Sequence, residues 1–214
     1  LVTALVPSLA NSLAEQFNVF RVMHHGTHEK QLSNVFAWLL RADGTHQLGD
    51  AFQRLFVARV NDQLPIGSRL PASGYAVAQE VNTAGEDGSE KEIADIVLTH
   101  DQGRIVVENF EWSDGHGHSY ERYLAHGSRD GKVGVVVLLC VRHVGHLLKD
   151  GWENAVVVTY AELLNSLQKH IAGNAAWRRA HPRQDFFIAE LVDHYTEGPG
   201  VVSIEDRIRF LKAM

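Results

Sequence analysis

The stretch ADIVLTHDQGRIVVENF, residues 94–110, decides the fold. Two apolar runs rich in β-branched residues flank a short polar segment, a pattern typical of two strands joined by a hairpin turn. If the loop is Asp101-Gln102, counting back along both strands places Asp95 directly opposite Glu108. Opposed residues on antiparallel strands share a face, with Cβ atoms about 5 Å apart. The sequence therefore predicts two neighbouring carboxylates on one face of a sheet.

Two like charges placed in this way destabilise a sheet unless a cation lies between them. Mg²⁺ suits the position, because it prefers one or two carboxylates and fills its other positions with water and substrate phosphate. In the alternative interpretation, Asp95 is a strand-edge acid and Glu108 lies on the solvated face of an antiparallel sheet. Apolar residues expected on the same face indicate a covered cleft instead: Ile93, Val97, Val106 and Phe110.

The rest of the chain predicts an α/β fold in which a mixed central sheet, with an antiparallel meander, is flanked by helices. The expected helices are 28–42, 48–60, 115–127, one beginning after Thr159, helices around 174–195 and 203–213, and the expected strands are 75–83, 94–98, 104–111, 133–141 and 155–158. Thr159 has the residue type of an N-cap, with Glu162 as its capping-box partner. No linker separates two domains, so we expect one domain over residues 1–214.

Four elements resemble the PD-(D/E)XK nuclease superfamily, especially bacterial members whose second strand ends in Glu-Asn-Lys. They are Glu29 in the helical segment 28–33, Asp95 in the first strand, Glu108 at the end of the second, and the helix-like segment SYERY, 119–123. The resemblance covers roughly residues 27–165 and leaves 174–214 as a helical extension. It implies a restriction-endonuclease-like core.

The resemblance also implies metal-dependent hydrolysis of phosphodiester bonds. Mg²⁺ or Mn²⁺ would be held by Asp95, Glu108 and the carbonyl of Asn109, polarising a phosphoryl oxygen and lowering the pKa of its water. Glu29 would approach the cation from the first helix and hold that water. Alternatively, Glu29 is a first-turn acid favoured by the helix dipole, next to a cap at Thr27. Glu80 on the preceding strand is a further candidate.

The chain departs from the family at two positions. Phe110 stands where the family has the lysine that orients or deprotonates the attacking water, and Ser119 stands where the family often has glutamine. Removing one such electrostatic contact typically lowers an enzymatic rate about 10²–10³-fold. Lys91, on the strand of Asp95, and Arg122, on the following helix, are candidate substitutes.

Histidine is abundant, with 13 residues that gather mainly in three clusters: His24, His25 and His28; His116 and His118; His143 and His146. His24 and His28 are spaced by four, and such a pair on a helix can hold a transition metal. No third ligand is recognisable beside them, so we expect structural or solvated roles for the histidines. His118 stands closest in sequence to the helix of the cleft. The most basic stretch, 177–183, could contact phosphates or form a solvated helix face.

Composition limits the partners. The formal charge is −6, from 20 basic and 26 acidic residues, so contact with nucleic acid requires a local basic patch. The longest apolar run, 133–141, is too short to span a bilayer, and residues 1–10 lack the features of a signal peptide. The single cysteine, Cys140, excludes an internal disulfide and is expected in the core. We expect a cytoplasmic protein that binds nucleic acid, with DNA preferred to RNA, and that does not bind a membrane. A homodimer is compatible with the sequence.

Three functions remain compatible with the sequence. A metal-dependent nuclease explains the paired acids and needs a substitute for the lysine. A catalytically inactive module of the same fold, binding nucleic acid or protein, explains Phe110. An unrelated protein that binds a metal or a small molecule explains the histidines but leaves the hairpin pairing accidental. Mn²⁺ bound between the acids would favour the first.

Overall fold

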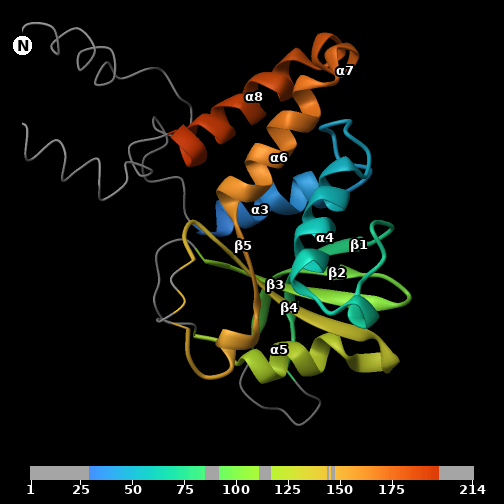
Figure 1. Ribbon diagram of the computed structural model, residues 1–214, viewed down its shortest axis with the longest axis vertical. Coiled ribbons are helices and arrows are strands. Elements are labelled where there is room, and N and C mark those ends of the chain that lie inside the picture. Colours follow the sequence, from blue (N-terminus) through green and yellow to red (C-terminus); the bar gives the residue numbers. More distant parts are fainter. Residues whose placement is uncertain (1–28, 85–91, 111–116, 144, 146–147, 198–214) are drawn as a thin grey trace, which may run out of the picture.

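Five strands form one mixed sheet in the computed structural model, which describes residues 29–84, 92–110, 117–143, 145 and 148–197 (Figure 1). The strand order is β1-β2-β3-β4-β5. Their bounds are β1 Ala76–Asn82, β2 Ile93–Thr99, β3 Gly103–Phe110, β4 Val133–Cys140 and β5 Val156–Thr159. The first three pair antiparallel, and β3, β4 and β5 pair parallel. The predicted mixed sheet with an antiparallel meander is confirmed.

Six α-helices accompany the sheet in the described part of the chain. They are α3 Glu29–Leu40, α4 Ala51–Gln63, α5 Tyr120–Gly127, α6 Tyr160–Ala172, α7 Ala175–Ala180 and α8 Pro182–Val192. Short 3-10 turns lie at Ile66–Ser68, Arg129–Gly131 and Trp152–Asn154, and a π-helical turn over Asp193–Glu197 follows α8. The helix predicted over 203–213 lies outside the described residues. No described helix has the length and apolar character needed to cross a bilayer.

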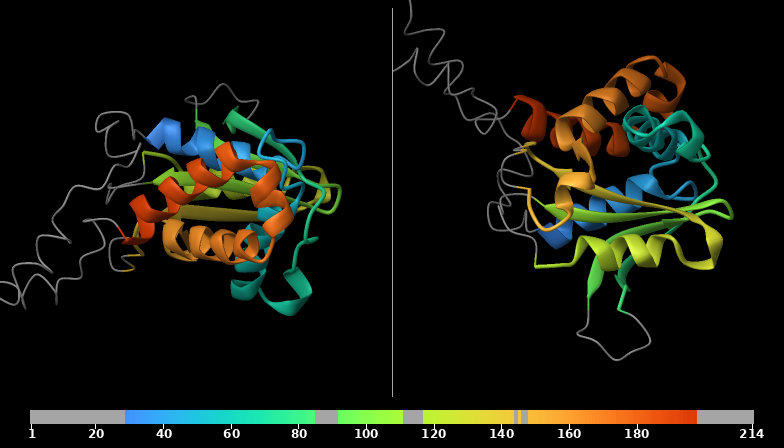
Figure 2. Two further views of the ribbon diagram at one scale, coloured as in Figure 1. Left: turned by 90° about the horizontal axis from the view of Figure 1, so that it is seen from above. Right: turned by 60° about the horizontal axis from the view of Figure 1, so that its bottom comes forward.

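The helices cover the two faces of the sheet unequally (Figures 1 and 2). The larger core packs α3, α4, α6 and α8 against one face, whereas α5 packs against the other face beside β3 and β4. Strand β4 is buried on both sides, as is usual for a parallel strand covered by helices. Its Cys140 lies in the core on the α5 side, as expected from the sequence.

The hairpin between β2 and β3 has the predicted register. Ile96 pairs with Val107 and Thr99 with Arg104, and the His100 N–H donates to the Gly103 carbonyl at 2.9 Å. The loop is therefore the two residues Asp101-Gln102. Space is tight at the start of β3, because a Cβ on Gly103 would lie 2.5 Å from Cδ2 of Leu70, which would have to shift.

Two helix starts show how local chemistry sets the boundaries. The Thr159 side chain accepts from the Glu162 N–H while the Glu162 carboxylate accepts from the Thr159 N–H, which confirms the predicted capping box at α6. The helix expected over 115–127 begins instead at Tyr120. Ser119 is its N-cap, and its hydroxyl accepts from the Arg122 N–H at 3.3 Å. Ser119 thus has a structural role at this position.

Candidate active site

Asp95 lies in β2 at the point where the ladder with β3 ends. The last pair of that ladder is Ile96 with Val107, and beyond it the Asp95 carboxylate accepts from the Asn109 N–H at 2.8 Å. Burial raises the pKa of Asp95 above its ordinary value, while this hydrogen bond and the nearby His118 and Lys30 act in the opposite direction. The carboxylate is thus fixed at the strand junction in a poorly solvated position.

Glu108, near the end of β3, is 7% exposed and points toward α5. Its Oε2 accepts from the Tyr123 hydroxyl at 2.8 Å, and the same hydroxyl lies 2.9 Å from the Ile93 carbonyl. Burial, followed by the charge of Glu108, raises the pKa of Tyr123 far above its ordinary range. Tyr123 therefore remains protonated and serves as a donor that fixes the orientation of Glu108.

Asp95 and Glu108 share electrostatic neighbours, Tyr123 and His118. The negative charges of Glu108 and of Asp95 both raise the pKa of Tyr123, and His118, which lies 3.8 Å from Glu108, lowers the pKa of Asp95. Of the four apolar residues expected on this face, Val97, Val106 and Phe110 belong to the core cluster on the α5 side, whereas Ile93 does not. Asp95 and Glu108 directly follow the last pair of the hairpin ladder, Ile96 with Val107, and the charges of both act on Tyr123. Their direct opposition and a shared site stay predictions.

Asn109, between Glu108 and Phe110, faces the opposite side of the sheet. Its buried side chain donates to the Ser33 hydroxyl of α3 at 2.9 Å and accepts from the Tyr160 hydroxyl of α6. The carboxamide thus ties two helices to the end of β3. If Asn109 binds a cation, it does so through its backbone carbonyl, which is the group proposed from the sequence.

Of the two proposed substitutes for the lysine, Arg122 pairs with another acid instead of with Asp95 or Glu108. Arg122 pairs with the carboxylate of Glu92 at 3.1 Å, which also accepts from the Ser119 N–H. Arg122 faces the start of β2 because Glu92 provides a nearly buried partner there. Lys91 lies outside the described residues.

Of the other candidate site residues, only His118 is found beside Glu108 in the described part of the chain. Glu29 is the first residue of α3, and its side chain is outside the described part of the structure. Glu80 pairs with Lys30 at 3.2 Å and has a positive φ of 50° within β1. His118 lies at the acids, and His143 is exposed. The other clustered histidines, His24, His25, His28, His116 and His146, fall outside the described residues.

Sequence reasoning missed three contributors, namely Tyr123, Glu92 and Lys30. Tyr123 had a usable signal, because a cap at Ser119 sets the helix phase and directs Tyr120, Tyr123 and Leu124 toward the sheet. Glu92 and Lys30 had none, since their partners are distant in the sequence.

The oxygen donors at the site fit a hard divalent cation. Within the described ranges, no three side chains of His, Cys, Asp and Glu are arranged to hold a metal. Mg²⁺ does not need such a cage, because it commonly keeps several waters and takes one or two carboxylates. Asp95, Glu108 and the Asn109 carbonyl are all oxygen donors, and a cation would offset the burial that raises the pKa of Asp95.

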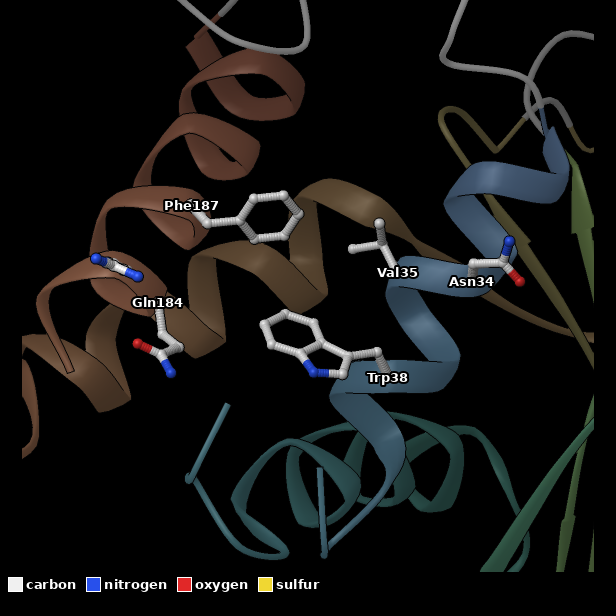
Figure 3. A pocket seen from close by; sticks show the side chains of 6 residues that line it. Asn34, Val35, Trp38, Gln184 and Phe187 are labelled. Atoms are coloured by element: carbon white, nitrogen blue, oxygen red, sulfur yellow. The ribbon is translucent and has the colours of Figure 1, made fainter. Parts of the chain in front are cut away.

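A separate groove of about 400 Å³ lies between α3 and α8 (Figure 3). Trp38 and Val35 of α3 face Phe187 of α8 across it, with the Trp38 and Phe187 rings 5.6 Å apart and nearly perpendicular. Arg183, from the basic stretch 177–183, contributes to its rim, while Arg178 of the same stretch pairs with Asp185. The groove is on the α3 side of the sheet, whereas Glu108 points toward α5 on the other side.

Comparison with known proteins identifies the family. A family model of the PD-(D/E)XK nuclease superfamily matches residues 17–138, more than half of the chain. The match includes β2 with Asp95, β3 with Glu108, and α5 with Tyr123. Searches of curated proteins and of solved structures gave no significant match. The five-stranded mixed sheet flanked by helices agrees with a restriction-endonuclease-like core. The chain belongs to the PD-(D/E)XK nuclease superfamily.

Proposed function

We propose that this protein is a metal-dependent nuclease that hydrolyses phosphodiester bonds, in DNA in preference to RNA, with Asp95 and Glu108 as its central acids. The observation that supports the proposal is the hairpin register, in which Asp95 and Glu108 directly follow the last strand pair, with Glu108 hydrogen-bonded to Tyr123 of α5. Bound Mg²⁺ or Mn²⁺ would polarise a phosphoryl oxygen and favour deprotonation of the attacking water.

The protein's own residues would hold this geometry in advance. The Asn109 N–H fixes the Asp95 carboxylate, and the Tyr123 hydroxyl fixes Glu108, so that neither acid has to be reoriented during the reaction. The Asn109 carbonyl would supply a third oxygen to the cation. Glu29, at the start of α3, would orient the water.

The proposed reaction is hydrolysis of a phosphodiester by water. The water oxygen bonds to phosphorus as the ester P–O bond breaks, which gives a phosphate monoester and an alcohol. The proton lost by the water passes to solvent, and the departing oxygen takes a proton from solvent. The family membership supports a nucleic acid as the substrate.

A catalytically inactive module of the same fold, binding nucleic acid or protein, is the second candidate. Phe110 favours it, because an apolar residue packed in the core on the α5 side occupies the family's lysine position. The pairing of Arg122 with Glu92 adds to this argument, since it engages one of the two predicted substitutes.

The two candidates differ in cleavage. The full chain is incubated with labelled single- and double-stranded DNA and RNA in EDTA, Mg²⁺ or Mn²⁺, beside Asp95→Asn and Glu108→Gln. Asp62→Asn is the matched control, because Asp62 is an exposed acid on α4. A nuclease cleaves only with metal and loses this activity in both site variants but not in the control. A binding module retains nucleic acid or protein without cleaving.

The proposal also includes a single domain over residues 1–214 and a cytoplasmic location, and it is compatible with a monomer or a homodimer. Limited proteolysis tests the domain, since a single unit should yield one protected core rather than two. Sedimentation distinguishes monomer from homodimer, and fractionation of cells tests the location.

A further inference from the structure

His118 is held rigidly beside the paired acids. Its carbonyl accepts from the indole N–H of the buried Trp152 at 3.1 Å, and its ring stacks on that of Tyr123, with centroids 5.6 Å apart and planes at 21°. Tyr123 in turn donates to Glu108. The imidazole and the Glu108 carboxylate are thus positioned by one side chain.

The two ring nitrogens of His118 lack hydrogen bonds within the described structure. Nε2 is 3.8 Å from Oε1 of Glu108, beyond hydrogen-bonding distance, and the buried Nδ1 has no partner among the described residues. Most buried polar atoms are paired. A polar separation of this length is one that a shared water commonly bridges. The side chain is 31% exposed, so solvent can reach it.

Two other described cations, Arg122 and Lys30, pair with acids other than Asp95 and Glu108. Arg122 pairs with Glu92, and Lys30, which is 81% exposed, pairs with Glu80. Among Lys, Arg and His in the described ranges, only His118 has a side-chain nitrogen within 4 Å of a carboxylate oxygen of Asp95 or Glu108. His118 also lowers the pKa of Asp95 through its charge.

We propose that His118 takes the place of the lysine replaced by Phe110, and that a ring nitrogen hydrogen-bonds the water that attacks phosphorus. The inference rests on the proposed nuclease function. The role needs a nitrogen at a fixed position beside Glu108, so that a water can lie between them, and the stacking on Tyr123 and the Trp152 hydrogen bond supply that position. Bond making and breaking are those of the hydrolysis described above.

Two variants separate this role from packing. His118→Phe keeps an aromatic ring for stacking on Tyr123 but removes both nitrogens, and His118→Gln keeps a hydrogen-bonding amide without the ring. We expect His118→Phe to lower kcat about 10²–10³-fold and to change KM less than about threefold. His118→Gln should retain more activity than His118→Phe, although it loses the ring contact.

A second-site rescue sharpens the test. Residues 108 and 110 point to the same side of β3, so Phe110→Lys would place an ammonium near Glu108. In the His118→Phe background, Phe110→Lys should recover at least about tenfold in kcat, because it restores a donor to the attacking water. Adding Mn²⁺ should raise the thermal midpoint of His118→Phe as much as that of the parent, because His118 is not proposed as a ligand.

The outcomes distinguish the two proposals. Metal-dependent cleavage by the parent, lost in Asp95→Asn but unchanged in His118→Phe, overturns the role of His118 and leaves the nuclease. Equal loss in His118→Phe and His118→Gln, with lowered midpoints and no rescue by Phe110→Lys, also overturns it in favour of packing. A parent that cleaves nothing with either metal overturns both proposals.

Discussion

Glu108 and Asn109 are neighbours on β3, but they face opposite sides of the sheet and have different surroundings. The Asn109 side chain is bonded to α3 and α6 through Ser33 and Tyr160. On the other side, Glu108 is accompanied by Asp95, whose pKa is raised by burial, and by His118, whose Nδ1 has no partner among the described residues. On one face a neutral amide ties helices to the sheet, whereas on the other a buried acid lies beside an imidazole, an arrangement more common at functional sites.

The largest expected effect is on the acid side of this comparison. Asp95→Asn and Glu108→Gln should each reduce metal-dependent cleavage by at least about 10³-fold, since each removes a proposed ligand of the cation and an essential negative charge. Rates on labelled DNA, measured beside the exposed-site control Asp62→Asn, test this. Cleavage by either variant within tenfold of the parent would mean that the acids are not the centre of the reaction.

The amide side should respond in stability. Asn109→Ala removes the hydrogen bonds of the carboxamide to the Ser33 and Tyr160 hydroxyls, and losing one partner of a buried polar group costs about 1–3 kcal/mol. We expect the free energy of unfolding to fall by about 2–4 kcal/mol in urea titrations. Asn165→Ala, at an exposed position of α6, is the matched control and should change it by less than about 0.5 kcal/mol. Equal effects of both substitutions would contradict a structural role for Asn109.

On stability, Asp95 should behave in the opposite way to Asn109. Its folded-state pKa is raised, so the folded protein favours the protonated carboxyl, and stability present at low pH is lost as the pH rises through that pKa. In EDTA at neutral pH, Asp95→Asn should therefore raise the thermal midpoint, because the amide removes the buried charge and can still accept from the Asn109 N–H. The difference from the parent should shrink as the pH approaches about 4. A lowered midpoint at neutral pH would show that the ionised carboxylate stabilises the fold.

The smallest effect is expected at His46, a buried histidine in the loop after α3. Its ring bonds the Arg41 carbonyl and accepts from the Leu48 N–H, and burial lowers its pKa. Protonation favours the unfolded chain, so this contribution to stability is present above about pH 6.5 and is lost as the pH falls through the lowered pKa.

Urea titrations at several pH values should therefore show a shallower acid dependence for His46→Gln than for the parent. His143→Gln, at an exposed position, should follow the parent and serves as the control. Identical slopes for the parent and His46→Gln would indicate that His46 has an ordinary pKa in the folded protein.

Local patterns in the sequence were sufficient for the framework of the site. The two-residue loop at Asp101-Gln102 fixed the register, since the hairpin leaves one way to pair the strands once its turn is known. The capping box at Thr159 was readable for the same reason, because its partners are three residues apart. The family resemblance is confirmed over residues 17–138.

Contacts between distant residues were not readable. Arg122 could reach the acids as judged from its helix, but it pairs with Glu92, 30 residues earlier in the chain. The hydrogen bond between Asn109 and Ser33 spans 76 residues, and no periodicity indicates which hydroxyl will meet the amide. Such partners depend on how α3, α5 and α6 pack on the sheet, which spacing along one element does not specify.

The most direct test of the proposed metal-dependent site is a crystal structure of the full chain grown in millimolar Mn²⁺, with anomalous scattering recorded at the manganese edge. We expect a manganese peak between β2 and β3, bound by carboxylate oxygens of both Asp95 and Glu108, and no such peak in Asp95→Asn. A parent structure that shows no manganese at these two carboxylates, or their side chains on opposite faces of the sheet, would contradict the assignment.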